Sequence, residues 1–147
     1  MDPEKEELYQ ELILDHNRTP RHFHVLESHS HTASNYNAIC GDRLTIYLKI
    51  SDNRIVAASF EGRGCAISTA SASMMTTILP GMALDEAEEL FRFFRETLFS
   101  DGEVNEGILG ELSALTGVRR APTRIKCALL AWEAMRTAIH RPAVSKS

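Results

Sequence analysis

The regular alternation of apolar and polar residues over positions 43–50 restricts the possible folds of this chain more than any other feature. Every second residue is apolar: Leu44, Ile46, Leu48 and Ile50. A period of two predicts a β-strand with one buried face. Residues 51–54 have the composition of a hairpin turn, and residues 55–61 predict a returning strand with Val56, Ala58 and Phe60 on one side. The chain should therefore contain an antiparallel pair of strands.

Segments with helical spacing of apolar residues lie on both sides of this hairpin. Helices are predicted over residues 5–16, 66–79, 84–99 and 110–116, and a last helix begins at Pro122. Residues 22–37 are polar and contain four histidines, so we expect a long, mobile connection there. The order of helix, strands and helices predicts an α+β fold, in which a small antiparallel β-sheet packs against several α-helices.

The length and composition are those of one ordinary globular domain. The chain has 147 residues, of which 44% are hydrophobic and 24% are charged. We expect a single domain over residues 1–147, with a core at about 5–140 and a frayed tail at 141–147. A net charge of −4 without a dense Lys/Arg cluster argues against nucleic-acid binding.

Neither a membrane segment nor a targeting segment is evident in the sequence. No apolar run approaches the roughly 20 residues that span a bilayer. The acidic N-terminus lacks the basic and apolar regions of a signal peptide. These observations predict a cytoplasmic protein that does not bind membranes.

Three cysteines and one carboxylate are the candidate functional residues. Cys40, Cys65 and Cys127 each lie at a junction between a turn and an element, and Asp42 follows Cys40 by two residues. Three thiolates and a carboxylate form a four-ligand set that suits Zn²⁺ or one iron–sulfur cluster. The long sequence spacing of these residues matches no local zinc motif. The position of the cysteines at junctions is therefore the stronger argument for a metal site.

The surroundings of the cysteines are expected to favour thiolates. Cys65 and Cys127 are predicted at or just inside helix N-termini, where the helix dipole lowers the pKa of a thiol. Arg63, Arg124 and Lys126 lie beside them in the sequence and should act in the same direction. The alternative is that each cysteine is a small buried hydrophobic residue and that Asp42 is an ordinary turn residue.

The histidines offer a rival metal site. His22 and His24, and likewise His29 and His31, are spaced to chelate, but a polar connection positions ligands poorly. His16 ends the first predicted helix, where a cation would favour the helix dipole.

Several motifs resemble those of the SufU branch of the IscU and NifU-N iron–sulfur cluster assembly family. They are Leu8-Tyr9 with Ile13-Leu14-Asp15-His16 and Pro20-Arg21, then Cys40-Gly41-Asp42-Arg43, then Phe60-Glu61-Gly62 with Gly64-Cys65-Ala66-Ile67-Ser68, and finally Arg124-Ile125-Lys126-Cys127 with Trp132. The resemblance covers about residues 5–140, which is nearly the whole chain.

The resemblance implies a fold, a metal and partners. It implies an α+β sandwich and one tightly held zinc ion on Cys40, Asp42, Cys65 and Cys127. It also implies that Cys40 accepts persulfide sulfur from a SufS-like cysteine desulfurase of the SUF pathway, and that Arg124 supports the contact with this enzyme. A downstream scaffold or iron–sulfur apo-proteins would then receive the sulfur.

Two departures separate the sequence from the IscU branch. IscU proteins carry a histidine immediately before the last cysteine, and this chain has Lys126 there. The chaperone-binding Leu-Pro-Pro-Val-Lys stretch of IscU is also replaced, by residues 120–126. The segment at about 101–117 resembles the insertion of the SufU branch.

The sequence is therefore compatible with three functions. The first is a zinc-dependent sulfurtransferase that acts through Cys40. The second is a scaffold on which a transient [2Fe–2S] cluster forms, with iron on the same ligands, before its transfer to apo-proteins. The third is a structural zinc module for protein interactions, although such sites are usually Cys₄, Cys₃His or Cys₂His₂.

Overall fold

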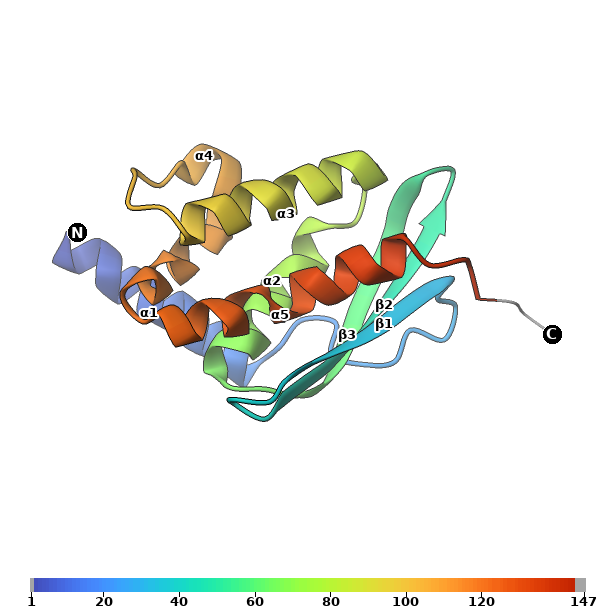
Figure 1. Cartoon of the computed structure of the whole chain (residues 1–147), viewed down its shortest axis with the longest axis horizontal. Coiled ribbons are helices and arrows are strands. Elements are labelled where there is room, and N and C mark those ends of the chain that lie inside the picture. Colours follow the sequence, from blue (N-terminus) through green and yellow to red (C-terminus); the bar gives the residue numbers. More distant parts are fainter. Residues whose placement is uncertain (1, 145–147) are drawn as a thin grey trace.

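Three antiparallel strands form the sheet of the computed structural model, which describes residues 2–144. The strands are β1 (His31–Asn37), β2 (Asp42–Ser51) and β3 (Arg54–Arg63), and β2 lies in the centre (Figure 1). The predicted hairpin is confirmed as β2 and β3. A register shift at Lys49/Ile50 changes the buried face near the turn, so that Ile55 is fully buried and Val56 is exposed. The expectation that Val56 shares a side with Ala58 and Phe60 is therefore wrong.

Strand β1 lies inside the polar segment for which the sequence predicted a mobile connection. It pairs with β2 along its whole length, from His31 opposite Leu48 to Asn37 opposite Asp42. Of its side chains, only Ala33 and Asn37 are buried. Backbone pairing with an apolar neighbouring strand holds this strand in place, and its own side-chain pattern contains no signal of this. The expected connection is thus wrong for residues 31–37.

Within residues 2–144, five α-helices and one 3₁₀-helix complete the α+β fold. They are α1 (Pro3–Arg18), α2 (Ala66–Ile78), α3 (Leu84–Leu98), α4 (Glu106–Leu109), the 3₁₀-helix η1 (Gly110–Arg120) and α5 (Pro122–Ile139). α5 contacts β1 and β2, α2 contacts α5 and α1, and α3 lies outside them, as Figure 1 shows. The predicted fold class is confirmed. The short helix α4 was not predicted.

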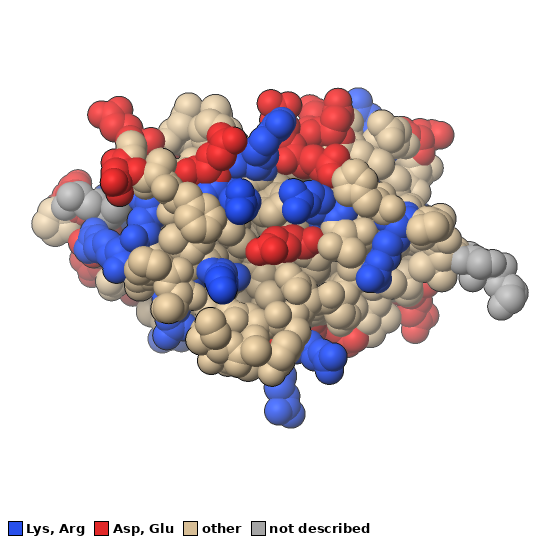
Figure 2. Space-filling model, in the orientation of Figure 1, with Lys and Arg blue, Asp and Glu red and all other residues tan. Residues whose placement is uncertain are grey.

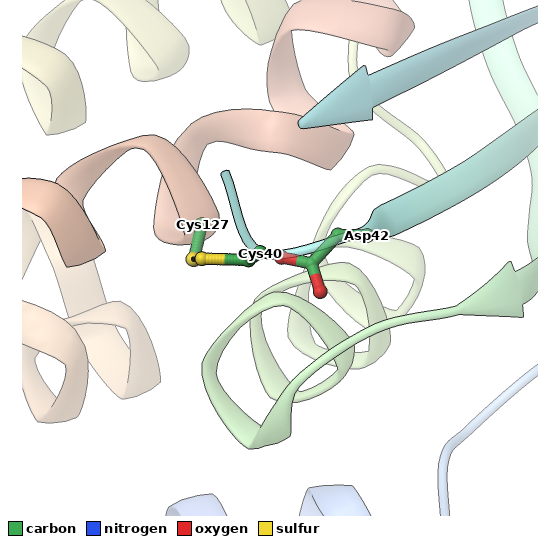
Figure 3. A group of neighbouring side chains, drawn as sticks. All are labelled: Cys40, Asp42 and Cys127. Carbon is green, nitrogen blue, oxygen red and sulfur yellow. Dashed lines mark hydrogen bonds between the residues drawn. The ribbon is translucent and has the colours of Figure 1, made fainter. Parts of the chain in front are cut away.

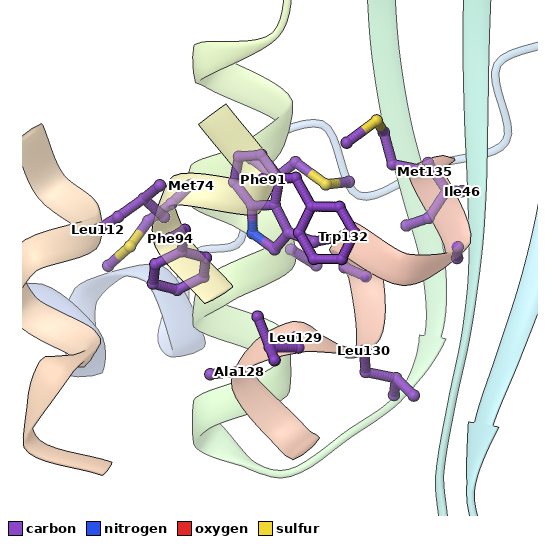
Figure 4. Packing of buried hydrophobic residues seen from close by; sticks show 14 of the residues in the cluster. Ile46, Met74, Phe91, Phe94, Leu112, Ala128, Leu129, Leu130, Trp132 and Met135 are labelled. Carbon is purple, nitrogen blue, oxygen red and sulfur yellow. The ribbon is translucent and has the colours of Figure 1, made fainter. Parts of the chain in front are cut away.

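The centre of the core is Trp132 of α5. Its side chain is fully buried, and its ring centroid lies 6.3 Å from that of Phe91 and 5.7 Å from that of Phe94, both on α3 (Figure 4). The indole N–H donates to Ser71 Oγ at 3.2 Å, and Ser71 Oγ donates to the carbonyl of Ala128 at 2.6 Å. Because these bonds satisfy the buried polar groups, α2 and α5 can pack against each other.

His16 anchors helix α1 to the body of the protein. Its side chain is 2% exposed, with Nδ1 2.7 Å from Ser73 Oγ and Nε2 3.3 Å from Glu111 Oε1. Burial, and then the charge of Arg21, lowers the pKa of His16. The expectation of a helix-terminal cation is therefore wrong, because the buried position favours the neutral imidazole.

The chain end after α5 lies beside the beginning of β1. Val144 N–H donates to the carbonyl of Ser30, and the Arg141 guanidinium donates to that of Thr32. Residues 145–147 of the predicted frayed tail lie outside the described residues. Within residues 2–144, no helix has both the length and the apolar character that crossing a membrane requires.

Candidate metal centre

Three segments that are distant in sequence meet at one end of the sheet. They are the turn between β1 and β2, the N-terminus of α2, and the second turn of α5. The Sγ atoms of Cys40 and Cys127 lie 3.4 Å apart, and one carboxylate oxygen of Asp42 lies with them, so that all three ligand atoms are within 4.8 Å of one another (Figure 3). Three of the four predicted ligands are thus brought together.

Cys65 joins the group through its backbone. Its N–H donates to Asp42 Oδ1 at 2.9 Å. Among the residues described, the ligand atoms that all lie within 4.8 Å of one another belong to Cys40, Asp42 and Cys127, and the Sγ of Cys65 is not one of them. The sulfur is the N-cap of α2 and accepts the N–H of Ser68 at 3.4 Å. The predicted position of Cys65 at a helix N-terminus is confirmed.

The turn that presents Cys40 is shaped by Asn37, a residue that sequence reasoning missed. Asn37 Oδ1 accepts the N–H of Ile39 at 3.2 Å, its carbonyl accepts the N–H of Gly41 at 2.8 Å, and its amide donates to Cys127 Sγ at 3.7 Å. Gly41 has φ of +73°, which favours glycine. Asparagine is a common turn former, and its position three residues before a cysteine was the available sequence signal for this turn.

Cys127 differs from its predicted environment. It lies in the second turn of α5, which begins at Pro122 as predicted, but its side chain is fully buried. Burial, and then the hydrogen bond with Cys40, raises the pKa of the Cys127 thiol. The expected lowering of this pKa is wrong, because burial removes the solvent that would stabilise the thiolate.

Arg124 lies one turn before Cys127, on the exposed start of α5. The charges of Cys65 and then of Cys127 raise the pKa of its guanidinium, so the side chain faces the sulfur atoms. Arg124 and Cys65 also line one end of an open cleft of about 500 Å³, which continues past Tyr9 and Ile13 of α1. The site therefore has positive charge on the side where a partner could approach.

The residues present fit a zinc ion. Asp42 is 2% exposed, and its Oδ2 is buried without a hydrogen-bond partner among residues 2–144. A buried carboxylate oxygen without a partner is costly, and a cation next to it removes that cost. Sulfur donors from Cys40 and Cys127 with a carboxylate oxygen of Asp42 match the ligand preferences of Zn²⁺.

The histidine alternative receives no support from the geometry. The Nδ1 atoms of His22, His24, His29 and His31 each lie within hydrogen-bond distance of a nearby oxygen. Within the described part of the chain, no group of three or more clustered ligand residues includes a histidine.

Comparisons with known proteins find related sequences and related folds. The model of the NifU-like N terminal domain matches residues 8–142. The chain is 40% identical, over 129 residues, to the zinc-dependent sulfurtransferase SufU of Bacillus subtilis, covering 87% of this chain and 86% of the relative. It is 38% identical, over 136 residues, to the iron–sulfur cluster assembly scaffold protein IscU of Streptococcus pyogenes. This match covers 92% of this chain and 85% of the relative.

Solved structures show the same fold. A crystal structure of a hypothetical protein has a TM-score of 0.85 and 37% identity, covering 92% of this chain and 98% of the other. A candidate iron–sulfur cluster assembly scaffold protein for the SUF system from Fervidobacterium islandicum has a TM-score of 0.83 and 31% identity. This match covers 90% of this chain and 97% of the other. The chain therefore belongs to the NifU-like N-terminal domain family, the family of the iron–sulfur cluster assembly proteins SufU and IscU.

Proposed function

We propose that this protein is a zinc-dependent sulfurtransferase of iron–sulfur cluster assembly, which accepts persulfide sulfur from a cysteine desulfurase on Cys40. The observation that carries the proposal is the unequal exposure of the donor residues. Asp42 and Cys127 are buried, whereas Cys40 lies exposed on a turn. One donor can therefore meet a partner while the others stay fixed in the fold.

Each residue of the centre has a separate part. Cys127 and Asp42 would hold the zinc ion from the protein interior, Cys40 from the surface, and Cys65 as the fourth ligand. The bound zinc supplies a positive charge that keeps the cysteines deprotonated at neutral pH. Asn37 orients the turn of Cys40 and donates to Cys127 Sγ, so its role is one of positioning.

Sulfur transfer needs only an exchange between sulfur atoms. The Cys40 thiolate attacks the terminal sulfur of the persulfide on the donor cysteine, and a new S–S bond forms on Cys40. The S–S bond of the donor breaks, and its electron pair leaves with the donor cysteine as a thiolate. The reaction follows the rules of disulfide exchange and needs no external oxidant or reductant. Arg124, which faces the sulfur atoms, would stabilise the negative charge and contact the desulfurase.

A second function uses the same ligands. The protein could hold a [2Fe–2S] cluster as cargo and pass it to apo-proteins, and the 38% identity to a scaffold protein over most of both chains favours this alternative. Lys126, which replaces the histidine of IscU, is exposed. Its ammonium group has no lone pair for a metal ion. A closed structural zinc module fits less well, because Cys40 is exposed.

The deciding experiment combines the zinc-loaded protein with its cognate desulfurase and cysteine. We expect strong acceleration of sulfide release and a persulfide on Cys40, read by mass spectrometry of the intact protein. Cys40→Ser should abolish both, whereas Ser34→Ala on the exposed face of β1 should change neither. A Cys40→Ser protein that still carries persulfide would refute the assignment. Absence of acceleration, with a cluster forming after iron addition, would establish the scaffold function instead.

A further inference from the structure

Two arginines face each other on the outer surface of the sheet, at the end that carries the metal centre. Arg43 of β2 pairs in register with Arg63 of β3, and on its other side with Tyr36 of β1. All three side chains are exposed, whereas Asp42 and Leu44, the neighbours of Arg43, point inward and are buried. We call Tyr36, Arg43 and Arg63 the arginine row.

The arginine row is unfavourable for the isolated protein. Like charges directly opposite each other on neighbouring strands destabilise a sheet. Within residues 2–144, neither Arg43 nor Arg63 has a carboxylate within 4.0 Å. The nearby carboxylate of Glu61 instead accepts the hydroxyl hydrogen of Tyr47 at 2.6 Å. Among residues 2–144, the two positive charges are therefore left without an anionic partner.

The backbone holds the two arginines in this arrangement. Gly62, the residue before Arg63, has φ of +128°, and a Cβ atom there would lie 2.1 Å from the carbonyl oxygen of Arg43. Only glycine permits this close approach of the two strands. On the other side, the guanidinium of Arg43 lies 6.0 Å from the ring centroid of Tyr36, a cation–π distance.

The row borders a shallow hollow that leads to the turn of Cys40. The hollow has a volume of about 440 Å³, and its walls are Tyr36, Gly41, Arg43, Thr45, Glu61, Gly62 and Arg63. Gly41 is the residue next to Cys40 in the chain. Positive side chains project at this edge of the molecule in Figure 2, and acidic ones gather over α3 and α4. A partner that contacts the turn of Cys40 from the outer face of the sheet therefore lies beside the arginine row.

We propose that the arginine row binds the carboxylates of an acidic surface on the protein that donates sulfur to Cys40. This inference rests on the proposed function and names the chemistry of its partner. A guanidinium pairs with a carboxylate through two parallel N–H···O bonds, and two adjacent arginines can take two acidic side chains. Charge pairs of this kind at an interface raise the association rate and fix the orientation of the partner. The row would align the donor cysteine with Cys40.

The test uses the zinc-loaded full chain and the cognate cysteine desulfurase. The double variant Arg43→Gln/Arg63→Gln is compared with Lys49→Gln, which removes a positive charge from the same face of β2, about 20 Å away. We expect the double variant to weaken binding at low salt about tenfold or more, mainly through slower association. The loss should shrink at high salt, and Lys49→Gln should bind like the wild type. Zinc content and thermal midpoint serve as controls for folding.

Each remaining outcome is decisive. An unchanged Kd of the double variant, with normal persulfide loading of Cys40, would overturn this inference and leave the proposed function intact. An equal loss in Lys49→Gln would also overturn it, because the effect would then be one of overall charge. Inorganic phosphate that binds the row in a titration without any change in desulfurase affinity would assign the row to a free anion. A wild-type protein that does not bind the desulfurase would refute the proposed function and this inference together.

Discussion

The carboxylate of Asp42 joins the sheet to helix α2 by accepting the backbone N–H of Cys65 at 2.9 Å through Oδ1, while its buried Oδ2 has no hydrogen-bond partner. One oxygen thus fixes the N-terminus of a helix, and the carboxylate as a whole lies beside the sulfur atoms of Cys40 and Cys127, with one oxygen within 4.8 Å of both. A metal ion bound at this carboxylate would offset the cost of burying its charge. The geometry of this centre and of the fold that supports it leads to four testable predictions.

Asp42→Asn should weaken zinc binding while leaving the fold intact. The amide oxygen can still accept the Cys65 N–H, but the group has no negative charge, and its NH₂ has no lone pair for the metal. We expect a loss of zinc affinity of about tenfold or more, measured by competition with a chromophoric chelator. Without metal the variant should be at least as stable as the wild type, because a buried charge is removed.

The matched control for this variant is Asp52→Asn. Asp52 lies in the β2–β3 turn with φ of +51°, a conformation that asparagine adopts readily. Its zinc affinity should equal that of the wild type. Equal affinities for Asp42→Asn and Asp52→Asn would show that Asp42 does not bind the metal.

The three cysteines of the metal-free protein should react with iodoacetamide at different rates. Cys40 is exposed, Cys65 is partly buried and Cys127 is fully buried. Because alkylation needs an accessible thiolate, Cys40 should react about tenfold or more faster than Cys127. Peptide mass spectrometry over time measures the order, and protein unfolded in guanidinium should lose it. Zinc should protect all three; a Cys65 that stays as reactive as before would show that it is not a ligand.

The stability of the protein should decrease as the pH falls through the range in which His16 titrates. Burial lowers the pKa of His16 in the folded state, so the unfolded chain binds more protons below about pH 6.5. Its stabilising contribution is therefore complete above the unfolded pKa and is lost at lower pH, by up to about 1.4 kcal/mol per pH unit.

His16→Gln isolates this contribution. The variant should be less stable than the wild type at pH 7.5, and the difference in free energy of unfolding should narrow towards pH 5.5. Urea titrations at several pH values measure it. The pKa of His31 is lowered too, again by burial, but His31 is present in both proteins. A difference that stays constant with pH would contradict a neutral buried His16. His24→Gln, at an exposed position, is the control.

Gly62→Ala should destabilise the sheet at the metal end. The backbone has a positive φ at this position, and the added methyl group would meet the carbonyl oxygen of Arg43. We expect a loss of about 1–3 kcal/mol in the free energy of unfolding, measured by urea denaturation. At Gly117, nothing lies within 4 Å of an added Cβ, so Gly117→Ala should cost little or stabilise slightly. Similar losses for both variants would refute the steric argument.

The local elements could be predicted from the sequence because their signals are local. The alternation from Leu44 to Ile50 and the turn composition at residues 51–54 were enough for the β2–β3 hairpin. The helical spacing of Ile125, Leu129 and Trp132 was likewise enough for α5. In each case the side chains that form the buried face carry the period of the element.

Elements held by other elements could not be predicted in this way. β1 is polar along most of its length, and its position depends on hydrogen bonds to β2. The solvation of Cys127 likewise depends on the α5 packing that buries it, which reversed the expected direction of its pKa shift. Asn37 entered the site only through the turn geometry that carries its side chain to Cys127.

The sequence by itself determined α1, the β2–β3 hairpin, α2, α3 and α5, the α+β class and the four candidate donors, because periodicity, turn residues and ligand chemistry belong to short segments. Only the tertiary structure decided which donors meet and which one faces the solvent. Cys40 and Cys127 are 87 positions apart in the chain, and their Sγ atoms lie 3.4 Å apart. The packing of α2 and α5 against the sheet brings these sulfur atoms together and buries Asp42 beside an exposed Cys40. This packing depends on buried area and hydrogen bonds between distant segments, which no short segment contains.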